Sequence, residues 1–353
     1  KYAAECGNVF MKNPVQCEEV HNGIFQIPTD INASSFFDGG EKVLLTSGLF
    51  AGVTKESFVA PQRLNTGSLS KKHGNYFNFY CWLIGVTDSD GGFSIEKSGV
   101  NKFVWSFYID QHIYNIKLLI YIRSVLSVGS VDNSGKTMRK FRIRDRSILK
   151  AVIIPIFTQL PLLTSKMYRF KLWLKAMQIW EDTSLSKEDR VKAVLVIKEQ
   201  MACIPQGYKS SAFDILPSDA SVEVLNNFYN SHWVAGFTEG DGSFYIVQKS
   251  SDRFIPGFAI SQKLDAHILE HLKKIFHISA NLKHSSTFYL LDTTNARSLT
   301  NILNYFSNHL ISMKYTEYRI WARALHYYNS PGTNYKKILH CRNLLKNFRD
   351  KSI

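Results

Sequence analysis

Two short segments of the chain place an aspartate directly before a glycine. Asp90 precedes Gly91 and Asp241 precedes Gly242, each after a run of mostly apolar residues that predicts a buried helix. A carboxylate at the C-terminal end of a helix meets the negative end of the helix dipole, and a second carboxylate nearby adds repulsion. This arrangement is costly unless a divalent cation neutralises it, and Mg²⁺ prefers carboxylate oxygens together with phosphate oxygens and water. The alternative, an aspartate that merely ends a helix, loses weight because both segments share one register.

The two aspartates belong to an internal duplication. Three blocks of the first half match blocks of the second: Trp82–Phe93 with Trp233–Phe244 and Phe107–Gln111 with Phe258–Gln262, both at an offset of 151, and Lys166–Trp173 with Lys314–Trp321 at an offset of 148. Because the blocks keep their order and nearly constant spacing, chance similarity is excluded. Each half therefore brings an aspartate, a glutamine and a lysine in the same order.

The spacing of apolar residues predicts the same elements in both halves. In the first half we expect, in order, helix Phe79–Thr87, strands Phe93–Glu96 and Phe103–Ile109, helix Ile116–Leu126, a strand over Lys140–Arg146 and helix Tyr168–Met177. Helices over Ile268–Phe276 and Tyr318–Leu325 repeat this pattern in the second half. Each half is thus αββαββα or close to it, which predicts an α+β fold.

The charge distribution favours a nucleic acid as the partner. The net charge is +14, of which residues 75–203 carry +8 and residues 204–353 carry +6, whereas residues 1–74 are neutral. Basic and apolar residues alternate over Lys140–Arg146, so one face of such a strand could pack on helices while the other faces phosphates. The histidines and cysteines show no zinc-binding spacing, and no apolar run is long enough for a membrane span, so neither a zinc site nor a membrane partner is expected.

The duplicated aspartate segments, each followed by a strand, a glutamine and a lysine, resemble the signature of LAGLIDADG homing endonucleases and their intron-maturase relatives. Two copies in one chain are similar to the single-chain members, and the resemblance covers roughly residues 75–350. The sequence departs from the pattern at Ile84, where alanine is common, and at Glu239 in the first acidic position. The resemblance implies two pseudo-symmetric αββαββα halves whose antiparallel sheets form a saddle over DNA. It also implies that the motif helices pack side by side, which Gly85 and Gly236 would permit.

The resemblance further implies the roles of the matched polar residues. The acid before each motif glycine binds the metal in the family, so the predicted Mg²⁺ site comprises Asp90, Asp241, Gly91 and Gly242. The predicted catalytic residues are Asp90, Asp241, Lys166, Lys314, Gln111 and Gln262. The glutamines would help to hold the water or metal shell, and the lysines would reach the scissile phosphates. The alternatives are polar residues on exposed strands and solvated lysines at helix starts, respectively. Asp88 and Glu239 are expected to be structural, bonding to nearby backbone.

Specificity in the family comes from strands laid into the major groove. The side chains predicted to contact DNA are Ser94, Glu96, Lys140, Arg142 and Arg144 in the first half and Ser243, Tyr245, Lys249 and Lys283 in the second. Arg144 could read guanine, whereas many lysines would only neutralise phosphate. Because the halves differ in these side chains, an asymmetric target is expected; the alternative for any one residue is a merely solvated strand face.

These observations predict a site-specific double-strand DNA endonuclease that acts as a monomer with a divalent metal on a long asymmetric target. The alternative is a group I intron maturase that binds its intron RNA, alone or as a second activity; retention of both aspartates favours the nuclease. The predicted divisions are an extension of unknown role over 1–74, a first half over 75–203, a linker over 204–225 and a second half over 226–353. An organelle-encoded protein is expected, with the mitochondrion preferred to the chloroplast.

Overall fold

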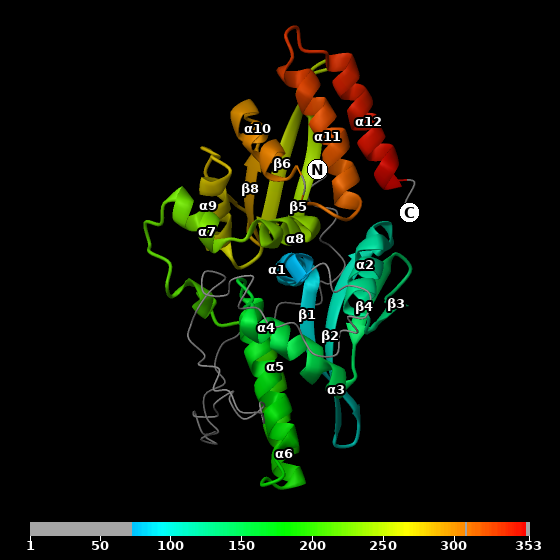
Figure 1. Cartoon of the computed structure of the whole chain (residues 1–353), viewed down its shortest axis with the longest axis vertical. Helices are drawn as coiled ribbons and strands as arrows, with labels where there is room; N and C mark the ends of the chain where they lie inside the picture. The colour runs from blue at the N-terminus through cyan, green and yellow to red at the C-terminus, as the bar shows by residue number, and fades with distance from the viewer. Residues whose placement is uncertain (1–72, 308, 351–353) are drawn as a thin grey trace. The chain divides into compact units, whose positions relative to one another are not determined.

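The computed structural model describes residues 73–307 and 309–350, all within one compact unit, so the predicted extension over residues 1–74 lies almost wholly outside the described residues. Two four-stranded antiparallel sheets dominate this part of the chain, and helices α1 (His73–Asp90) and α8 (Ser231–Asp241) lie side by side, one at each sheet (Figure 1). None of the helices in the described ranges is long and apolar enough to cross a membrane.

The first half is built around a sheet with the strand order β1-β2-β4-β3. Its elements after α1 are β1 (Gly91–Gly99), β2 (Lys102–His112), the 3-10 turn η2 (Ile113–Asn115), α2 (Ile116–Leu126), β3 (Ser130–Asn133), β4 (Met138–Ile143), α3 (Arg146–Ile148), the π-helical turn η3 (Leu149–Ile153), α4 (Ile154–Gln159), α5 (Lys166–Glu181) and α6 (Lys187–Ala202). Phe93 on β1 packs against Phe170 and Trp173 of α5, and all three rings are buried. Alternate strand residues therefore seal one face of the sheet against helices.

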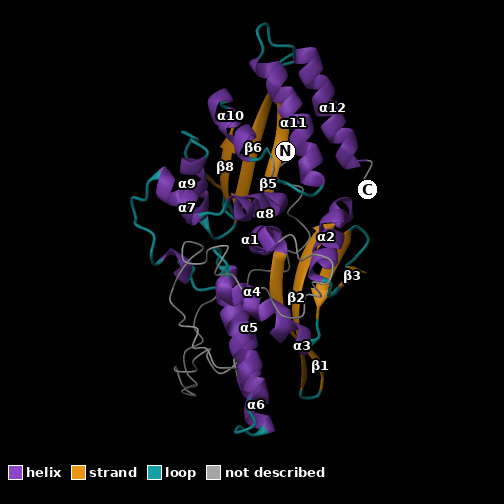
Figure 2. Ribbon diagram, in the orientation of Figure 1, coloured by secondary structure: helices purple, strands orange, loops and turns teal. Residues whose placement is uncertain are grey.

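The second half repeats this plan with the strand order β5-β6-β8-β7. Its elements are the 3-10 turn η4 (Ser211–Phe213), α7 (Val222–Phe228), α8, β5 (Gly242–Gln248), β6 (Phe254–Gln262), α9 (Ala266–Ile275), β7 (Lys283–His284), β8 (Tyr289–Thr293), α10 (Ala296–Tyr305), α11 (Met313–Asn329) and α12 (Tyr335–Asp350). Phe244 packs against Trp321 of α11 as Phe93 does against Trp173. Helices α11 and α12 lie against this sheet (Figure 2).

The predicted α+β fold of two pseudo-symmetric halves is confirmed, and each half also carries helices that the apolar pattern missed. Helix α6 buries only three residues, Val194, Ile197 and Met201, so its sequence gives little contrast between faces. The predicted strand Lys140–Arg146 is wrong at both ends, because β4 spans Met138–Ile143. Asp145 stops the strand: its side chain accepts a hydrogen bond from the Ile148 amide at 3.0 Å and caps α3, so Arg144 lies beyond the sheet.

The backbones of α1 and α8 approach one another most closely at two glycines. A Cβ atom added to Gly85 would lie 2.1 Å from the carbonyl oxygen of Trp233, and one added to Gly236 would lie 2.0 Å from that of Trp82. A Cβ on Gly240, one residue before Asp241, would lie 2.4 Å from the Asp90 carboxylate. The helices therefore stay in contact from their crossing to their C-terminal ends.

Replacing Gly85 by alanine should force these backbones apart. We expect the free energy of unfolding to fall by about 2 kcal/mol or more, because overpacking a rigid contact costs this much and the obstacle here is backbone. Urea or thermal unfolding measures the loss. Gly99→Ala is the matched control, since its Cβ would meet nothing closer than 3.9 Å; equal losses in the two variants would contradict the close-contact explanation.

Candidate active site

Asp90 and Asp241 are the last residues of α1 and α8, and a strand starts at the next residue in each case. This abrupt change of direction requires a residue without a side chain, since a Cβ on Gly91 would lie 2.7 Å from the Thr87 Cα atom. Both aspartates are half-buried, and the Asp90 carboxylate lies against the backbone that leads into Asp241. The two carboxylates are therefore neighbours.

A glutamine from the neighbouring strand orients each carboxylate. Gln111, near the end of β2, donates from Nε2 to Asp90 Oδ2 at 2.7 Å, and Gln262, at the end of β6, donates to Asp241 Oδ2. Asn115 in turn donates to Gln111 Oε1 at 3.0 Å, which fixes the direction of that amide. The structure thus brings together the aspartate and glutamine predicted in each half.

The two predicted lysines lie at the starts of helices, Lys166 as the first residue of α5 and Lys314 as the second of α11, and extend to the ends of the aspartate helices. Lys166 Nζ donates to the carbonyl oxygens of Thr87 at 3.1 Å and Ser89 at 2.5 Å. Lys314 Nζ donates to the carbonyl oxygen of Gly242 at 2.8 Å. Both ammonium groups lie at the C-terminal ends of helices, where a cation is favoured by the helix dipole.

Two carboxylates and a lysine ammonium lie close together at this site, and burial shifts the pKa of each. Burial raises the pKa of Asp90, although Lys166 and the Gln111 hydrogen bond partly offset the effect. Burial and the Asp90 charge raise the pKa of Asp241 well above its ordinary value. Burial also lowers the pKa of Lys166, despite the carboxylates around it. Two crowded carboxylates of this kind are stabilised when a cation lies between them.

The donor set fits a hard divalent cation. It offers carboxylate and backbone oxygens, and no group of three or more His, Cys, Asp or Glu residues within the described ranges could hold a metal by itself. Zinc prefers sites in which histidine nitrogens and cysteine sulfurs complete its coordination, whereas Mg²⁺ keeps water and phosphate oxygens in its shell. Asp90 and Asp241 would hold the ion. The Gly242 carbonyl already accepts the Lys314 hydrogen bond, and a metal contact from Gly91 or Gly242 stays a prediction.

The first acid of each motif has a structural role, as predicted. Asp88 is buried and accepts hydrogen bonds from the backbone amides of Leu163 and Thr164, both at 3.0 Å. Glu239 accepts corresponding bonds from the amides of Ile311 and Ser312. Each acid therefore fixes the loop that precedes the lysine-bearing helix of its own half.

Each half also caps the lysine helix of the other half. Asp265 of the second half accepts hydrogen bonds from the amide of Ser165 at 2.9 Å and from its hydroxyl at 3.0 Å, at the start of α5. Asn115 of the first half accepts from the amide of Met313 at 3.2 Å, at the start of α11. Neither residue was among those predicted from the sequence; a polar residue shortly after the matched glutamine in each half was the available signal.

The residues predicted to contact DNA lie mostly on one face of each sheet. Strand register places Ser94, Glu96, Lys140 and Arg142 on the face of the first sheet opposite its buried aromatic residues, and Ser243, Tyr245 and Lys283 on the corresponding face of the second. Lys249 follows the end of β5 and is exposed, as is Arg144 beyond β4.

Lys140 and Arg142 share one face of β4 and Phe141 and Ile143 are buried on the other, as expected, but the sheet faces as a whole are not simply basic. Most of the predicted cations have a carboxylate partner: Lys140 with Asp110 at 3.2 Å, Arg142 with Asp132 at 3.5 Å, Arg144 with Glu96 at 3.6 Å and Lys283 with Asp292 at 2.5 Å. Each carboxylate comes from another strand of the same sheet, so the alternation of a single strand could not reveal it. Much of the positive charge on these faces is therefore compensated in the free protein.

Tyrosines cover glycines at different places on the two faces. A Cβ on Gly92 would lie 2.6 Å from the hydroxyl of Tyr108, and one on Gly257 would lie 2.3 Å from the ring of Tyr245. Tyr245 also donates a hydrogen bond to Asp292. Because these pairs lie at non-equivalent positions of the duplication, the two sheet faces differ in shape.

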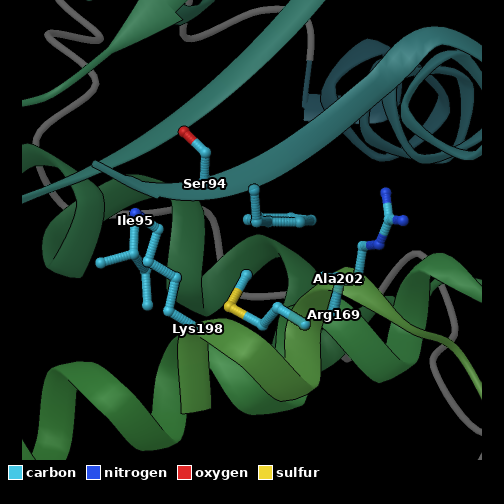
Figure 3. A pocket seen from close by; sticks show the side chains of 7 residues that line it. Ser94, Ile95, Arg169, Lys198 and Ala202 are labelled. Atoms are coloured by element: carbon cyan, nitrogen blue, oxygen red, sulfur yellow. The ribbon is translucent and has the colours of Figure 1, made fainter. Parts of the chain in front are cut away.

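A pocket lies along the edge strand β1, and neither carboxylate of the aspartate pair lines it. Its lining residues are Phe93, Ser94, Ile95, Arg169, Lys198, Met201 and Ala202, from β1, α5 and α6. Figure 3 shows the Ser94 hydroxyl on the opposite side of the strand from Lys198 and Ala202. That hydroxyl is hydrogen-bonded to the hydroxyl of Ser106, 2.7 Å away on β2. Ser94 thus belongs to the polar sheet face.

Solved structures of LAGLIDADG meganucleases share this fold. I-SmaMI, solved with an uncleaveable DNA, matches with a TM-score of 0.63 at 20% identity, over 76% of this chain and 96% of that one. I-AabMI, solved with uncleaved DNA, matches with a TM-score of 0.61 at 19% identity, over 76% of this chain and 98% of that one. At these identities the likeness establishes the fold alone.

Sequence comparisons identify the family. The model described as LAGLIDADG endonuclease matches residues 83–177 and 234–325. The probable intron-encoded endonuclease Cox1-I1b of Schizosaccharomyces pombe is 32% identical over 287 residues, covering 78% of this chain and 70% of that protein. The uncharacterized cox1 intron-2 protein of the same yeast is 26% identical, covering 72% of this chain and 67% of its own length. The chain belongs to the LAGLIDADG endonuclease family.

The cap formed by Asp265 gives stability a specific pH dependence. Burial raises the pKa of Asp265 to about 6, despite the hydrogen bonds from Ser165. Because this exceeds the pKa of about 4 in the unfolded chain, the folded protein binds the proton first as the pH falls. The group therefore adds stability below pH 4 that is lost as the pH rises through 6.

We expect the free energy of unfolding of the wild type, relative to Asp265→Asn, to increase by at most about 3 kcal/mol from pH 6 to pH 4. Urea unfolding of both proteins across this range measures the difference. Subtracting the value for the asparagine variant cancels the contribution of every other titrating group. A difference that stays constant with pH would show that Asp265 does not titrate in this range.

Proposed function

We propose that this protein is a site-specific DNA endonuclease that hydrolyses both strands of its target with a divalent metal, Mg²⁺ being the ion its donors suit. The observation that carries the proposal is the adjacent pair of half-buried carboxylates, Asp90 and Asp241, each with a matched glutamine and lysine. The minor groove is only about 6 Å wide, so acids that serve a phosphate on each strand must lie close together. The crossing of α1 and α8 provides this proximity.

The protein side chains divide the work of hydrolysis. Asp90 and Asp241 would hold the ion, and Gln111 and Gln262 would keep their carboxylates in the binding orientation. When bound there, a divalent cation supplies Lewis-acid stabilisation of the charge that develops at the phosphate. Lys166 and Lys314 lie at the helix ends, from which each would place a positive charge beside the phosphate of one strand.

The two sheet faces are proposed to read an asymmetric, double-stranded target. The different ion pairs and tyrosine positions of the two halves support this proposal, since identical half-sites would call for identical faces. The relatives I-SmaMI and I-AabMI have been solved with DNA. Binding would exchange part of the internal ion pairs for phosphate and base contacts, and the carboxylates Asp110, Asp132 and Asp292 could accept hydrogen bonds from cytosine amino groups.

We propose that the chain works as a monomer, with residues 75–203 and 226–353 as its two halves and residues 204–225 as the connection. The duplication supports this proposal, because one chain supplies both carboxylates. Its relatives include proteins named for introns of cox1 in S. pombe, which supports encoding within a mitochondrial intron. The joined exons that flank the reading frame are then the natural target.

Asp90→Asn and Asp241→Asn should each slow cleavage by about 100-fold or more, because each removes one of the charges that would hold the cation. Cleavage of a plasmid carrying the joined exons, with Mg²⁺ and with a chelator, measures the effect. DNA binding by these variants should remain within a few-fold of the wild type, as the sheet faces are untouched.

Asp182→Asn serves as the matched control, since it removes the same charge from an exposed turn between α5 and α6. Full activity in either site variant would remove that aspartate from the mechanism. Failure of the unaltered protein to cut the joined exons would contradict the proposed nuclease.

Asp132→Asn should strengthen binding to DNA of unrelated sequence, because it frees Arg142 from its carboxylate partner at 3.5 Å. The dependence of log K on log salt should steepen by up to about one unit, the effect of one added phosphate contact. Fluorescence anisotropy at several salt concentrations measures both quantities. If Asp182→Asn produces the same change, the effect is one of net charge and the compensated sheet face plays no part in it.

A further inference from the structure

The predicted catalytic lysine of the second half has a buried carboxylate beside it. Glu317 lies one turn after Lys314 on α11, is 2% exposed, and has an oxygen 3.6 Å from the Lys314 ammonium. Burial alone would raise the pKa of Glu317, but Lys314, Arg349 and Tyr114 together lower it to about 2. The glutamate is therefore a fixed negative charge next to a lysine that must remain available.

Arg349 holds this carboxylate from the C-terminal helix α12. Its guanidinium donates to Glu317 Oε1 at 2.9 Å and to Oε2 at 2.8 Å, and it also donates to the carbonyl oxygen of Phe244 on β5 at 3.1 Å. A two-point contact of this kind fixes both the position and the plane of the carboxylate. Helix α12 is thereby fastened to α11 and to the strand that starts beside Asp241.

A third contact comes from the first half of the chain. Tyr114, in the turn η2, donates from its hydroxyl to Glu317 Oε1 at 2.9 Å, and its ring lies edge-on to Phe348 of α12. Both oxygens of Glu317 are thus occupied by partners other than Lys314. The ammonium of Lys314 is left to bond the Gly242 carbonyl, next to the predicted metal ligand Asp241.

Among the residues that the structure describes, Lys166 of the first half has no such arrangement around it. The residue one turn after Lys166 is Arg169, an opposite charge at the position equivalent to Glu317. Arg169 lines the pocket between β1 and α6 (Figure 3), and Lys166 bonds the Thr87 and Ser89 carbonyls, whereas Lys314 bonds that of Gly242. The two lysines are therefore held by different means, although the halves share a fold.

We propose that Glu317, Arg349 and Tyr114 form a clamp that positions Lys314, so that cleavage of one DNA strand, and not the other, depends on helix α12. These are positioning residues, since they act through Lys314 and not on the DNA. Without Arg349, the buried charge of Glu317 would be short of partners and would draw the Lys314 ammonium away from Gly242. This proposal rests on the proposed nuclease function.

The test measures the cleavage rate of each strand separately. A duplex of the joined exons carries a different dye on each strand, and single-turnover rates are followed with Mg²⁺ in excess. Lys314→Met and Lys166→Met first assign each strand to its lysine. We expect Arg349→Ala to slow the strand assigned to Lys314 on the order of 10- to 100-fold and to leave the other within about twofold, because a small displacement of a catalytic group costs this much. A supercoiled plasmid should then accumulate as nicked circles.

A second change separates positioning from stability. In the Arg349→Ala background, Glu317→Gln removes the unbalanced buried charge and should restore much of the lost rate on the same strand. Arg349→Lys, which keeps the charge but not the two-point contact, should fall between the wild type and alanine. Lys346→Ala, at an exposed position of α12, is the matched control and should change neither strand.

Equal slowing of both strands by Arg349→Ala, or unchanged rates on both, overturns the clamp, as does slowing of the strand assigned to Lys166. Absence of rescue by Glu317→Gln also overturns it, because the charge of Glu317 is then not what displaces Lys314. These outcomes presuppose an active parent protein, so they differ from failure of the nuclease itself, in which the unaltered chain cuts neither strand.

Discussion

The backbones of α1 and α8 touch at Gly85 and Gly236 with no side chain between them. This contact sets the separation of the helix ends, and with it the separation of Asp90 and Asp241. The glutamines, the lysines and the loops fixed by Asp88 and Glu239 are all arranged around those two ends. This close packing places glycine within each helix and holds two like charges close together. Both features lower the stability of the fold, and the proposed function accounts for both.

Which site residues could be predicted from the sequence depends on whether they repeat in both halves. The duplication carried the aspartates, glutamines and lysines, because equivalent positions repeat at nearly constant offsets. It could not reveal Glu317 or Arg349, since these break the symmetry: the first half has Arg169 at the position of Glu317, and α12 has no repeated motif. Asp110 and Asp292 escaped for another reason. Their basic partners lie on the adjacent strand, and the alternation of residues along one strand does not show how that strand pairs with the next.

In the proposed complex with DNA, the charge on the sheet faces would serve selectivity more than attraction. A bare cationic face would bind any duplex tightly, whereas a face of internal ion pairs gives up existing contacts before it gains new ones. Discrimination between sequences would then depend on whether a base or phosphate can replace the carboxylate as the partner of each cation. The net positive charge of the chain remains available for long-range attraction, since Lys249 and other exposed cations lie outside these pairs.

The exchanged caps have a consequence for how such proteins diversify. Asp265 bonds the start of α5 and Asn115 bonds the start of α11, so each lysine helix takes part of its cap from the other half, beside the bonds from its own Thr164 or Ser312. The caps are also chemically unlike, one a carboxylate and the other an amide that is simultaneously engaged with Gln111. A half recombined with one from another lineage would inherit a motif helix that fits and a cap that does not. An exchange of halves would therefore have to preserve these cross-half hydrogen bonds as well as the packing of the motif helices.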